Sequence, residues 1–407
     1  MKFPFAAVEL ESDGSVRDPG QLEAARAVVD GADDVLVLVH GWNNDIPAAL
    51  GLYERLTDNI DAVRGQVPGA AGRKIAVVGV LWPSVKWADD DDLTGGGAGT
   101  ADAKDALVAE IGDRELDPSV AAQLQELVPE LDTSATARQQ YLDLLRAQLP
   151  SEIEGEEDAP PSSFLDGDAD TAFERAGRAG ALTGTGSAGG GAAGFSVGGF
   201  VRAARNLLNL TTYYTMRDRA GTVGANGIAP LLEQLHGDGR RIHLVGHSFG
   251  ARAATAAAKA TNAPVHSLGL LQGAFSHYAF ADDWNGQGAD GLFRAVPNRI
   301  HGPVVVTHTK NDKAIGLAYA VASRLARQVA IDIGGPDDRY GGIGRNGALK
   351  TPEALGPSSL QPVGGSYAFE PRRVSNLQAD TFISGHSAVT GKEVAYALLN
   401  AMVTPAA

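Results

Sequence analysis

Short apolar runs alternate along the chain with longer segments whose apolar residues have helical spacing. Residues 35–39 and 75–81 contain no charged or polar side chain, which is typical of strands buried on both faces of a parallel sheet. Strands that alternate with helices favour a mostly parallel sheet with helices on both faces, so we predict an α/β fold. The same reasoning predicts a hairpin at 3–10 and 14–17, strands at 242–245, 265–272, 303–308 and 374–379, and helices at 20–30, 47–63, 224–236, 251–260, 314–328 and 389–402.

This alternation is interrupted between residues 85 and 212. The interrupting segment contains four consecutive aspartates, Asp89 to Asp92, and its residues 184–199 are mostly Gly, Ala and Ser, a composition typical of flexible linkers. Amphipathic patterns within it predict helices at 103–112, 119–128 and 135–149. We therefore predict that residues 1–84 and 213–407 form the core, and that residues 85–212 are an inserted, mainly helical cap or lid.

The composition excludes several classes of function. The 407 residues include 34 basic and 49 acidic side chains, a net charge of −15, which disfavours binding to nucleic acid or to an anionic membrane. The chain has no cysteine, so it has neither disulfides nor thiolate metal sites nor a cysteine nucleophile. No apolar run of about 18 residues and no N-terminal signal pattern is present, so we expect a cytoplasmic protein without membrane insertion. Nothing in the sequence indicates the oligomeric state.

Residues 246–250 (GHSFG) form a G-x-S-x-G motif around Ser248. This motif places a serine on a tight strand-to-helix turn, whose strained backbone projects the hydroxyl above the edge of the sheet. Residues 194–198 (GFSVG) also match, but Ser196 lies in the glycine-rich tract, where a linker serine is expected. Ser248 follows a predicted buried strand and precedes a helix of small residues. We therefore predict that Ser248 is a nucleophile.

A serine hydroxyl needs a base and a group that orients the base. In folds of this kind they follow the serine in the order acid, then histidine. His386 lies in a polar loop after the last predicted strand, so we expect it to be the base. Asp312 follows the strand before that one, at the same sheet edge as Ser248, and is the expected acid. Asp282 and Asp283 are the alternative acid positions.

An acyl-transfer site also needs two backbone N–H groups that face the developing negative charge. We expect one from Phe249, directly after the nucleophile. The other should come from the loop after the first buried strand, which reads HGWNN and in which Gly41 permits close backbone approach. The Trp42 N–H is the expected donor, with Asn43 as the alternative. His40 is expected to hydrogen-bond the backbone rather than to take part in the chemistry.

Several aromatic residues lie close in sequence to these loops and favour a hydrophobic acyl pocket. They are Trp42, Trp82, Trp87, Phe249, Phe275 and Trp284. The candidates for lining the substrate pocket are Asn43, His247, Phe275 and Ser276.

Together, the His40-Gly41-Trp42 segment, the GHSFG motif, Asp312 and His386 resemble the α/β-hydrolase superfamily. Residues 82–84 (WPS) and 271–276 (LQGAFS) are similar to those of a bacterial branch of it. The resemblance covers the predicted core and not the insertion. It implies a serine hydrolase that cleaves carboxylic esters through an acyl-Ser248 intermediate, acting on a small acyl ester without a metal or organic cofactor. The aspartate run after residue 88 lacks the ligand spacing of a calcium loop.

Two other functions are compatible with the same residues. An amidase, peptidase, thioesterase or acyltransferase would use the same three side chains and differ in the leaving-group pocket. A non-catalytic binding protein on a hydrolase scaffold is the other alternative, because a fold does not fix a function.

Overall fold

One parallel β-sheet organises the protein. The computed structural model describes residues 1–42, 44–84, 100–179, 197–312, 319, 321–323, 325–326 and 335–407. The sheet has eight strands in the order β1-β3-β2-β4-β5-β6-β8-β7, and every neighbouring pair is parallel, so the prediction of an α/β fold is confirmed. The strands are β1 (Phe5–Glu9), β2 (Asp34–Val39), β3 (Ile75–Leu81), β4 (Arg241–His247), β5 (Val265–Leu271), β6 (Val304–His308), β7 (Ser358–Ser359) and β8 (Val374–Gln378).

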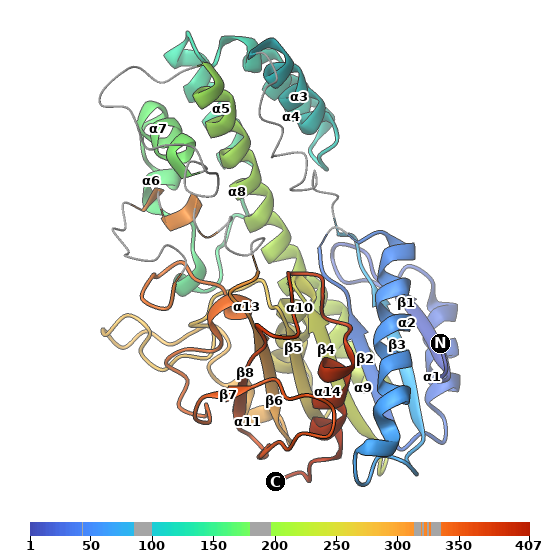
Figure 1. Ribbon diagram of the computed structural model, residues 1–407. Coiled ribbons are helices and arrows are strands. Elements are labelled where there is room, and N and C mark those ends of the chain that lie inside the picture. Colours follow the sequence, from blue (N-terminus) through green and yellow to red (C-terminus); the bar gives the residue numbers. More distant parts are fainter. Residues whose placement is uncertain are drawn as a thin grey trace.

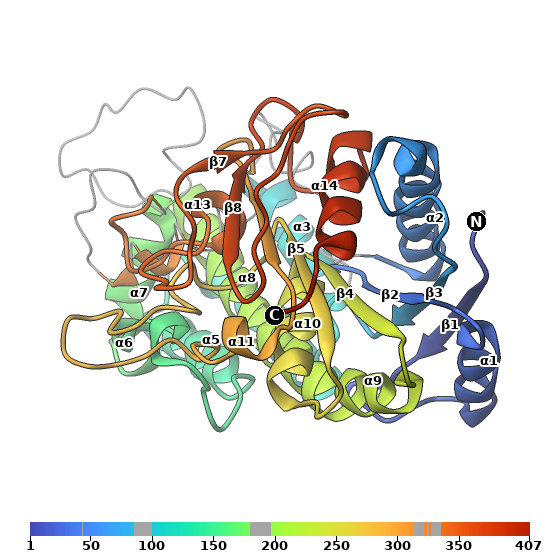
Figure 2. The same cartoon turned by 90° about the horizontal axis from the view of Figure 1, so that it is seen from below.

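Helices cover both faces of the sheet (Figures 1 and 2). Strand β2 illustrates why the apolar runs are continuous: Val35, Val37 and Val39 pack into one hydrophobic cluster, and Leu36 and Leu38 pack into another on the opposite face. The second face is covered by α2 (Ile46–Val63) and α14 (Lys392–Val403). The first is covered by α1 (Pro19–Val29), α9 (Ala229–Leu235) and α10 (Phe249–Ala260).

Polar residues define where these covering helices begin. The Asp18 side chain accepts a hydrogen bond from the Gly20 N–H at the start of α1, and the Asp45 side chain accepts one from the Ala48 N–H at the start of α2, both at 2.8 Å. Each helix also has a proline in its first turn, where the missing N–H costs no intrahelical bond. Helix α10 has no such side-chain cap, and its Ala251 N–H donates to the Ser248 carbonyl at 3.0 Å.

The segment between β3 and α9 carries further helices at one end of the sheet (Figure 1). Three of them match predicted helices: α3 (Thr100–Gly112), α4 (Pro118–Leu127) and α5 (Ala135–Arg146). The composition did not predict the next two, α6 (Ser162–Leu165) and α7 (Ala169–Ala179). The remaining short helices are α11 (Val296–Arg299), α13 (Ile343–Asn346), the 3-10 turns η1 (Arg64–Gln66), η3 (Val128–Glu130) and η4 (Glu156–Asp158), and the π-helical turn η6 (Gly224–Ile228).

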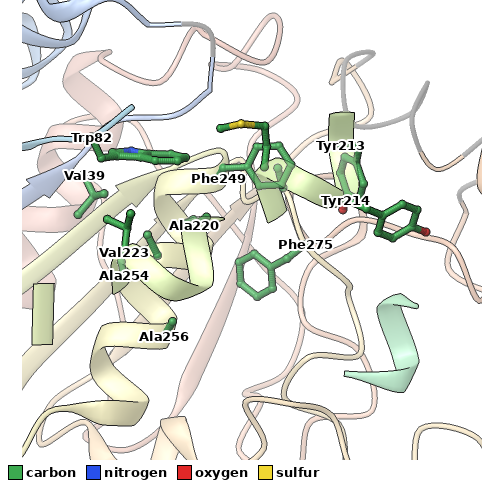
Figure 3. Packing of buried hydrophobic residues seen from close by; sticks show 14 of the residues in the cluster. Val39, Trp82, Tyr213, Tyr214, Ala220, Val223, Phe249, Ala254, Ala256 and Phe275 are labelled. Carbon is green, nitrogen blue, oxygen red and sulfur yellow. The ribbon is translucent and has the colours of Figure 1, made fainter. Parts of the chain in front are cut away.

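The long helix α8 (Val197–Val223) links these helices to the sheet. Thr212, where the insertion was expected to end, lies inside α8, so no loop separates insertion and core at that point. The C-terminal part of α8 packs on α10 through small side chains, and Figure 3 shows Ala220 and Val223 beside Ala254. A Cβ added to Gly224 would lie 2.2 Å from the carbonyl oxygen of Ala253, so the two helices require glycine at this contact.

Two short elements differ from the predictions. The expected N-terminal hairpin is present but short: an antiparallel bridge joins Leu10 to Val16, and the N–H groups of Glu11 and Arg17 donate to the carbonyls of Ser15 and Glu9. On its other side, β1 pairs in parallel with β3. Strand β7, two exposed serines, was not predicted, since it has no apolar pattern. Most of the predicted helix at 314–328 lies outside the described residues.

Candidate active site

The order of the strands predicts a site at the carboxyl edge of the sheet, between β2 and β4. From β2 the chain continues outward to β3, and from β4 it continues the other way to β5. The loops that follow β2 and β4 therefore diverge at the carboxyl edge of the sheet, which is where parallel α/β sheets form ligand crevices. The HGWNN loop follows β2, and Ser248 follows β4.

Ser248 joins β4 to α10 with φ 58° and ψ −125°, a backbone conformation that residues with side chains rarely adopt. The glycines of the motif allow this turn to pack. A Cβ added to Gly246 would lie 2.2 Å from the Gly250 carbonyl oxygen, and one added to Gly250 would lie 2.3 Å from the carbonyl oxygens of Val39 and His40. Both positions of the motif therefore require glycine, because any side chain there would collide with the neighbouring backbone.

The structure brings Ser248, His386 and Asp312 into one hydrogen-bonded row. The Ser248 Oγ–H donates to His386 Nε2 at 2.8 Å, and the His386 Nδ1–H donates to Asp312 Oδ2, also at 2.8 Å. The Asp312 side chain is fully buried, while that of His386 is 20% exposed. The histidine is therefore oriented by a buried carboxylate and can accept the serine proton, which is the geometry of an activated nucleophile.

Asp312 and His386 lie in neighbouring loops that are bonded to each other. Asp312 follows β6 and His386 follows β8, which lie side by side in the sheet. Asp380 accepts hydrogen bonds from Thr309 Oγ1 at 2.8 Å and from the Lys310 N–H at 3.0 Å. Asp380 therefore ties the loop that precedes Asp312 to the loop that precedes His386.

The alternative acids lie in a different turn. The Asp283 carboxylate accepts the Gly288 N–H at 2.6 Å, and the Asp282 N–H donates to the Lys350 carbonyl at 3.0 Å. The carboxylate that contacts His386 is Asp312.

The loop after β2 lies directly against the serine. A Cβ on Gly41 would lie 2.6 Å from Ser248 Cβ, so this close approach requires glycine. The His40 ring donates from Nδ1 to the Gly41 carbonyl at 2.8 Å and accepts at Nε2 from the Trp82 N–H at 3.1 Å. Both ring nitrogens are thus used by the backbone, and burial lowers the pKa of His40 to about 4. His40 fixes the loop, in agreement with its expected role.

The two residues expected to supply the backbone donors contact each other through their side chains. The indole ring of Trp42 packs edge-on against the Phe249 ring, with centroids 5.5 Å apart. Phe249 opens α10, whose first turn has no capping side chain. Asn43, the alternative donor, lies outside the described residues, as does Ser196 of the second motif.

The expected pocket residues separate into different environments. His247 donates from Nε2 to the His386 carbonyl at 2.9 Å, and its ring centroid lies 5.0 Å from that of His386, so it supports the loop of the base. Phe275 and Ser276 are buried, Phe275 against Phe280 and Phe293. The expectation that these two line the substrate pocket stays a prediction.

The six aromatic residues do not form one pocket either. Trp82 stacks on His40, and Trp284 stacks on Tyr278 in a small separate cluster. Trp87 lies outside the described residues. Trp42 and Phe249 remain beside the serine.

Sequence reasoning missed a buried polar cluster behind Phe249. Figure 3 shows Tyr213 of α8 near Phe249. The two ring centroids are 5.2 Å apart, and the Tyr213 hydroxyl donates to the Tyr319 hydroxyl at 2.7 Å. The Tyr319 hydroxyl donates in turn to Asp158 Oδ1 at 3.2 Å. These residues come from three distant segments, so no local pattern could have revealed the cluster.

Two arginines complete this cluster. Arg217 Nη1 donates to the Asp158 carbonyl, and Arg252 Nε donates to the Arg217 carbonyl at 2.8 Å. Burial raises the pKa of Asp158, with Arg217 and Arg252 opposing that shift. Burial, and then the charge of Arg217, lowers the pKa of Arg252 to about 10. Because Asp158 lies between β3 and α8 and Arg252 lies in α10, the cluster joins the segment that follows β3 to the helix that follows Ser248.

A second serine, histidine and aspartate arrangement occupies the opposite edge of the sheet. His243 hydrogen-bonds Ser267 Oγ at 2.8 Å through Nδ1 and Asp34 Oδ1 at 3.0 Å through Nε2, and Arg73 Nη2 donates to the same Asp34 oxygen at 2.7 Å. All three members of the arrangement are buried. Burial would raise the pKa of Asp34, but the bonds from His243 and Arg73 lower it below its ordinary value. Because this arrangement lies at the edge of the sheet opposite Ser248 and its histidine is fully buried, we assign it a structural role.

We expect the free energy of unfolding to decrease as the pH falls from 7 to 5. Burial lowers the pKa of several histidines, so below about pH 6.5 the unfolded chain binds more protons than the folded one, and each such histidine removes up to about 1.4 kcal/mol per pH unit. Burial raises the pKa of Asp158 and Glu157, which acts in the opposite direction. The histidines are His40, His243, His247, His266, His277 and His308.

Urea unfolding across this pH range measures the effect. His266, whose Nε2 bonds the Thr404 carbonyl at 2.9 Å, offers a test variant, because His266→Gln should make the dependence on pH shallower. The exposed His301 supplies the control, since His301→Gln should leave the dependence as it is. A stability that does not change between pH 7 and pH 5 would contradict the argument.

Within the described part of the chain, no group of three or more His, Asp or Glu side chains is arranged to hold a metal ion. The helices of that same part include none with the length and apolar character needed to cross a membrane. Comparisons of the chain with models of protein families, with curated proteins and with solved structures find no match.

Proposed function

We propose that this protein is a serine hydrolase of the α/β-hydrolase kind that cleaves carboxylic esters through an acyl-serine intermediate. The observation that carries the proposal is the hydrogen-bonded row from Ser248 through His386 to Asp312, with the serine on a positive-φ turn. The order of these residues along the chain, their position at the carboxyl edge of a parallel sheet and the glycine loop packed on Ser248 Cβ also support it.

In the proposed reaction, Ser248 Oγ attacks the carbonyl carbon of the ester and His386 Nε2 takes the hydroxyl proton. Asp312 stabilises the imidazolium that forms and keeps Nδ1 as the donor. The backbone N–H groups of Trp42 and Phe249 bind the oxyanion, and the loss of one such donor costs roughly a hundredfold in rate. His386 then gives its proton to the alkoxide oxygen, and the alcohol leaves.

The second half of the cycle repeats these steps with water. His386 removes a proton from a water molecule as its oxygen attacks the acyl carbon, and the proton returns to Ser248 Oγ when the acid is released. Neither half requires an oxidant, a reductant or a metal ion. Protonation of His386 removes the base, so the turnover rate should fall on acidification.

The insertion is proposed to act as a cap over the active edge. Two of its contacts with the core support this: the Glu157 carboxylate accepts the Leu292 N–H at 3.0 Å, and Tyr319 links Asp158 to Tyr213 beside Phe249. A cap at this position would shape the pockets for the acyl and alcohol groups.

Labelling with a fluorophosphonate probe tests the proposal. The probe forms a covalent bond with an activated serine, and mass mapping of the digested protein identifies which serine carries it. Labelling at Ser248, together with turnover of p-nitrophenyl esters, is the expected result. Folded protein that takes no label and turns over no ester would contradict the proposal and favour a binding protein on the same scaffold.

A further inference from the structure

We propose that Gln272 is a positioning residue for the acid of the active site: its amide holds the Asp312 carboxylate in the orientation that receives the His386 Nδ1–H. This inference rests on the proposed function. Gln272 directly follows β5, the strand that lies between β4, which carries Ser248, and β6, which precedes Asp312. It therefore stands between the nucleophile and the acid at the same edge of the sheet.

The Gln272 side chain uses all of its hydrogen-bonding groups within this site. The Nε2 amide donates to Asp312 Oδ2 at 3.3 Å and to the Gly344 carbonyl at 2.7 Å. The Oε1 oxygen accepts from the Thr307 hydroxyl at 3.0 Å. Since a carboxylate and a carbonyl can only accept, the amide end that faces them must be the NH2 group, and the oxygen must face Thr307.

The backbone of Gln272 is fixed as firmly as its side chain. Gln272 has φ 45°, a left-handed conformation that is uncommon outside glycine and clusters at functional sites. Its N–H donates to Thr307 Oγ1 at 3.3 Å. A Cβ on Gly344 would lie 2.5 Å from the Gln272 carbonyl carbon, so the loop of Gly344 presses directly on this residue. The side chain is fully buried.

These contacts restrict the rotation of the Asp312 carboxylate. Oδ2 accepts both the His386 Nδ1–H and the Gln272 amide. Because Gln272 is anchored by Gly344 and Thr307, the oxygen that it contacts is held toward His386. A neutral amide can do this without adding charge, whereas a second carboxylate at the same place would repel Asp312.

The test compares variants that lose a side-chain amide inside and outside this network. Gln272→Met keeps the length of the side chain and removes the donor, and Thr307→Val removes the hydroxyl that orients the amide. The matched control is Asn376→Leu, because Asn376 accepts from the Ala348 N–H at 2.8 Å and donates to the Ala348 carbonyl at 3.1 Å. Asn376 thus braces the loop that follows α13 without touching Asp312.

Two readouts separate positioning from structural support. The first is kcat and KM for p-nitrophenyl acetate, with unfolding midpoints measured in parallel. We expect Gln272→Met to lower kcat about tenfold or more with little change in KM, since small displacements in an active site cost rate rather than binding. Thr307→Val should have a smaller effect in the same direction, and Asn376→Leu should change only the unfolding midpoint.

The second readout is the downfield proton resonance of the His386 Nδ1–H, assigned by its loss in His386→Asn. This resonance reports the bond to Asp312 without requiring turnover. We expect it to shift or broaden in Gln272→Met and to stay unchanged in Asn376→Leu. An unchanged resonance and an unchanged kcat in Gln272→Met would overturn the inference, as would losses of kcat in Gln272→Met and Asn376→Leu that follow their unfolding midpoints. A wild-type protein that resists fluorophosphonate labelling would overturn the proposed function instead, while equal labelling rates of wild type and Gln272→Met would overturn only the role of Gln272.

Discussion

Replacement of Ser248 by alanine is expected to lower kcat for ester hydrolysis by about a millionfold, close to the background rate of the folded protein. The variant lacks the oxygen that forms the acyl bond and that donates to His386 Nε2 at 2.8 Å. Alanine meets the same backbone restriction at φ 58° as serine does, so the turn between β4 and α10 should persist. Steady-state kinetics with p-nitrophenyl esters and fluorophosphonate labelling measure the loss.

Two other serines provide matched controls. Ser196 belongs to the second G-x-S-x-G match, and Ser267 belongs to the buried arrangement with His243 and Asp34. Ser196→Ala should leave the rate nearly unchanged, and Ser267→Ala should affect stability more than kcat. Loss of activity in Ser196→Ala with retention in Ser248→Ala would show that the nucleophile is Ser196 and would contradict the assignment of Ser248.

Asp312→Asn should lower kcat by about ten-thousandfold, with little change in overall structure. The His386 Nδ1–H donates to Asp312 Oδ2 at 2.8 Å, and that bond keeps Nε2 free to accept the serine proton. An asparagine amide that donates to Nδ1 instead would move the ring proton to Nε2. The histidine could then no longer act as a base toward Ser248, and the imidazolium would lose its buried counter-charge.

Asp380 is the control for this substitution. It binds Thr309 and Lys310 in the loop next to Asp312. Asp380→Asn therefore perturbs the same loop without removing the acid, and its effect on kcat should be far smaller. If Asp312→Asn and Asp380→Asn reduced kcat equally, Asp312 would be a loop-bracing residue rather than the partner of the base.

The sheet was predictable because a strand that is buried on both faces appears in the sequence as a continuous apolar run. Strand β3 has the predicted bounds, residues 75–81, and the central strands lie within a few residues of their predicted positions. Each of these strands carries an apolar run whichever strands it pairs with, while polar side chains such as Asp34, His243 and Ser267 lie near the strand starts. The N-terminal segment was predictable only in part, because its turn is a local feature, whereas the parallel pairing of β1 with β3 joins residues about 70 positions apart.

The candidate site was predictable only in part. The G-x-S-x-G motif depends on contacts between residues close in sequence and on packing against the β2 loop, which only glycine permits. The pocket residues were less predictable: Phe275 and Ser276 follow a strand at the correct edge, and both are buried. Position along a strand gives the edge on which a residue lies, but not the direction in which a loop side chain points.

The sequence by itself determined the parallel α/β sheet, the strained turn at Ser248 and the order of serine, acid and histidine, because each follows from local apolar runs or from steric demands within a few residues. Only the tertiary structure decided which partners meet. His386 lies 138 residues from Ser248, and Gln272 lies 40 residues from Asp312. The chain contains two arrangements of serine, histidine and aspartate, and residue types do not distinguish them. The sheet edge and the burial of the histidine do: the His386 side chain is 20% exposed at the carboxyl edge, whereas that of His243 is fully buried at the opposite edge.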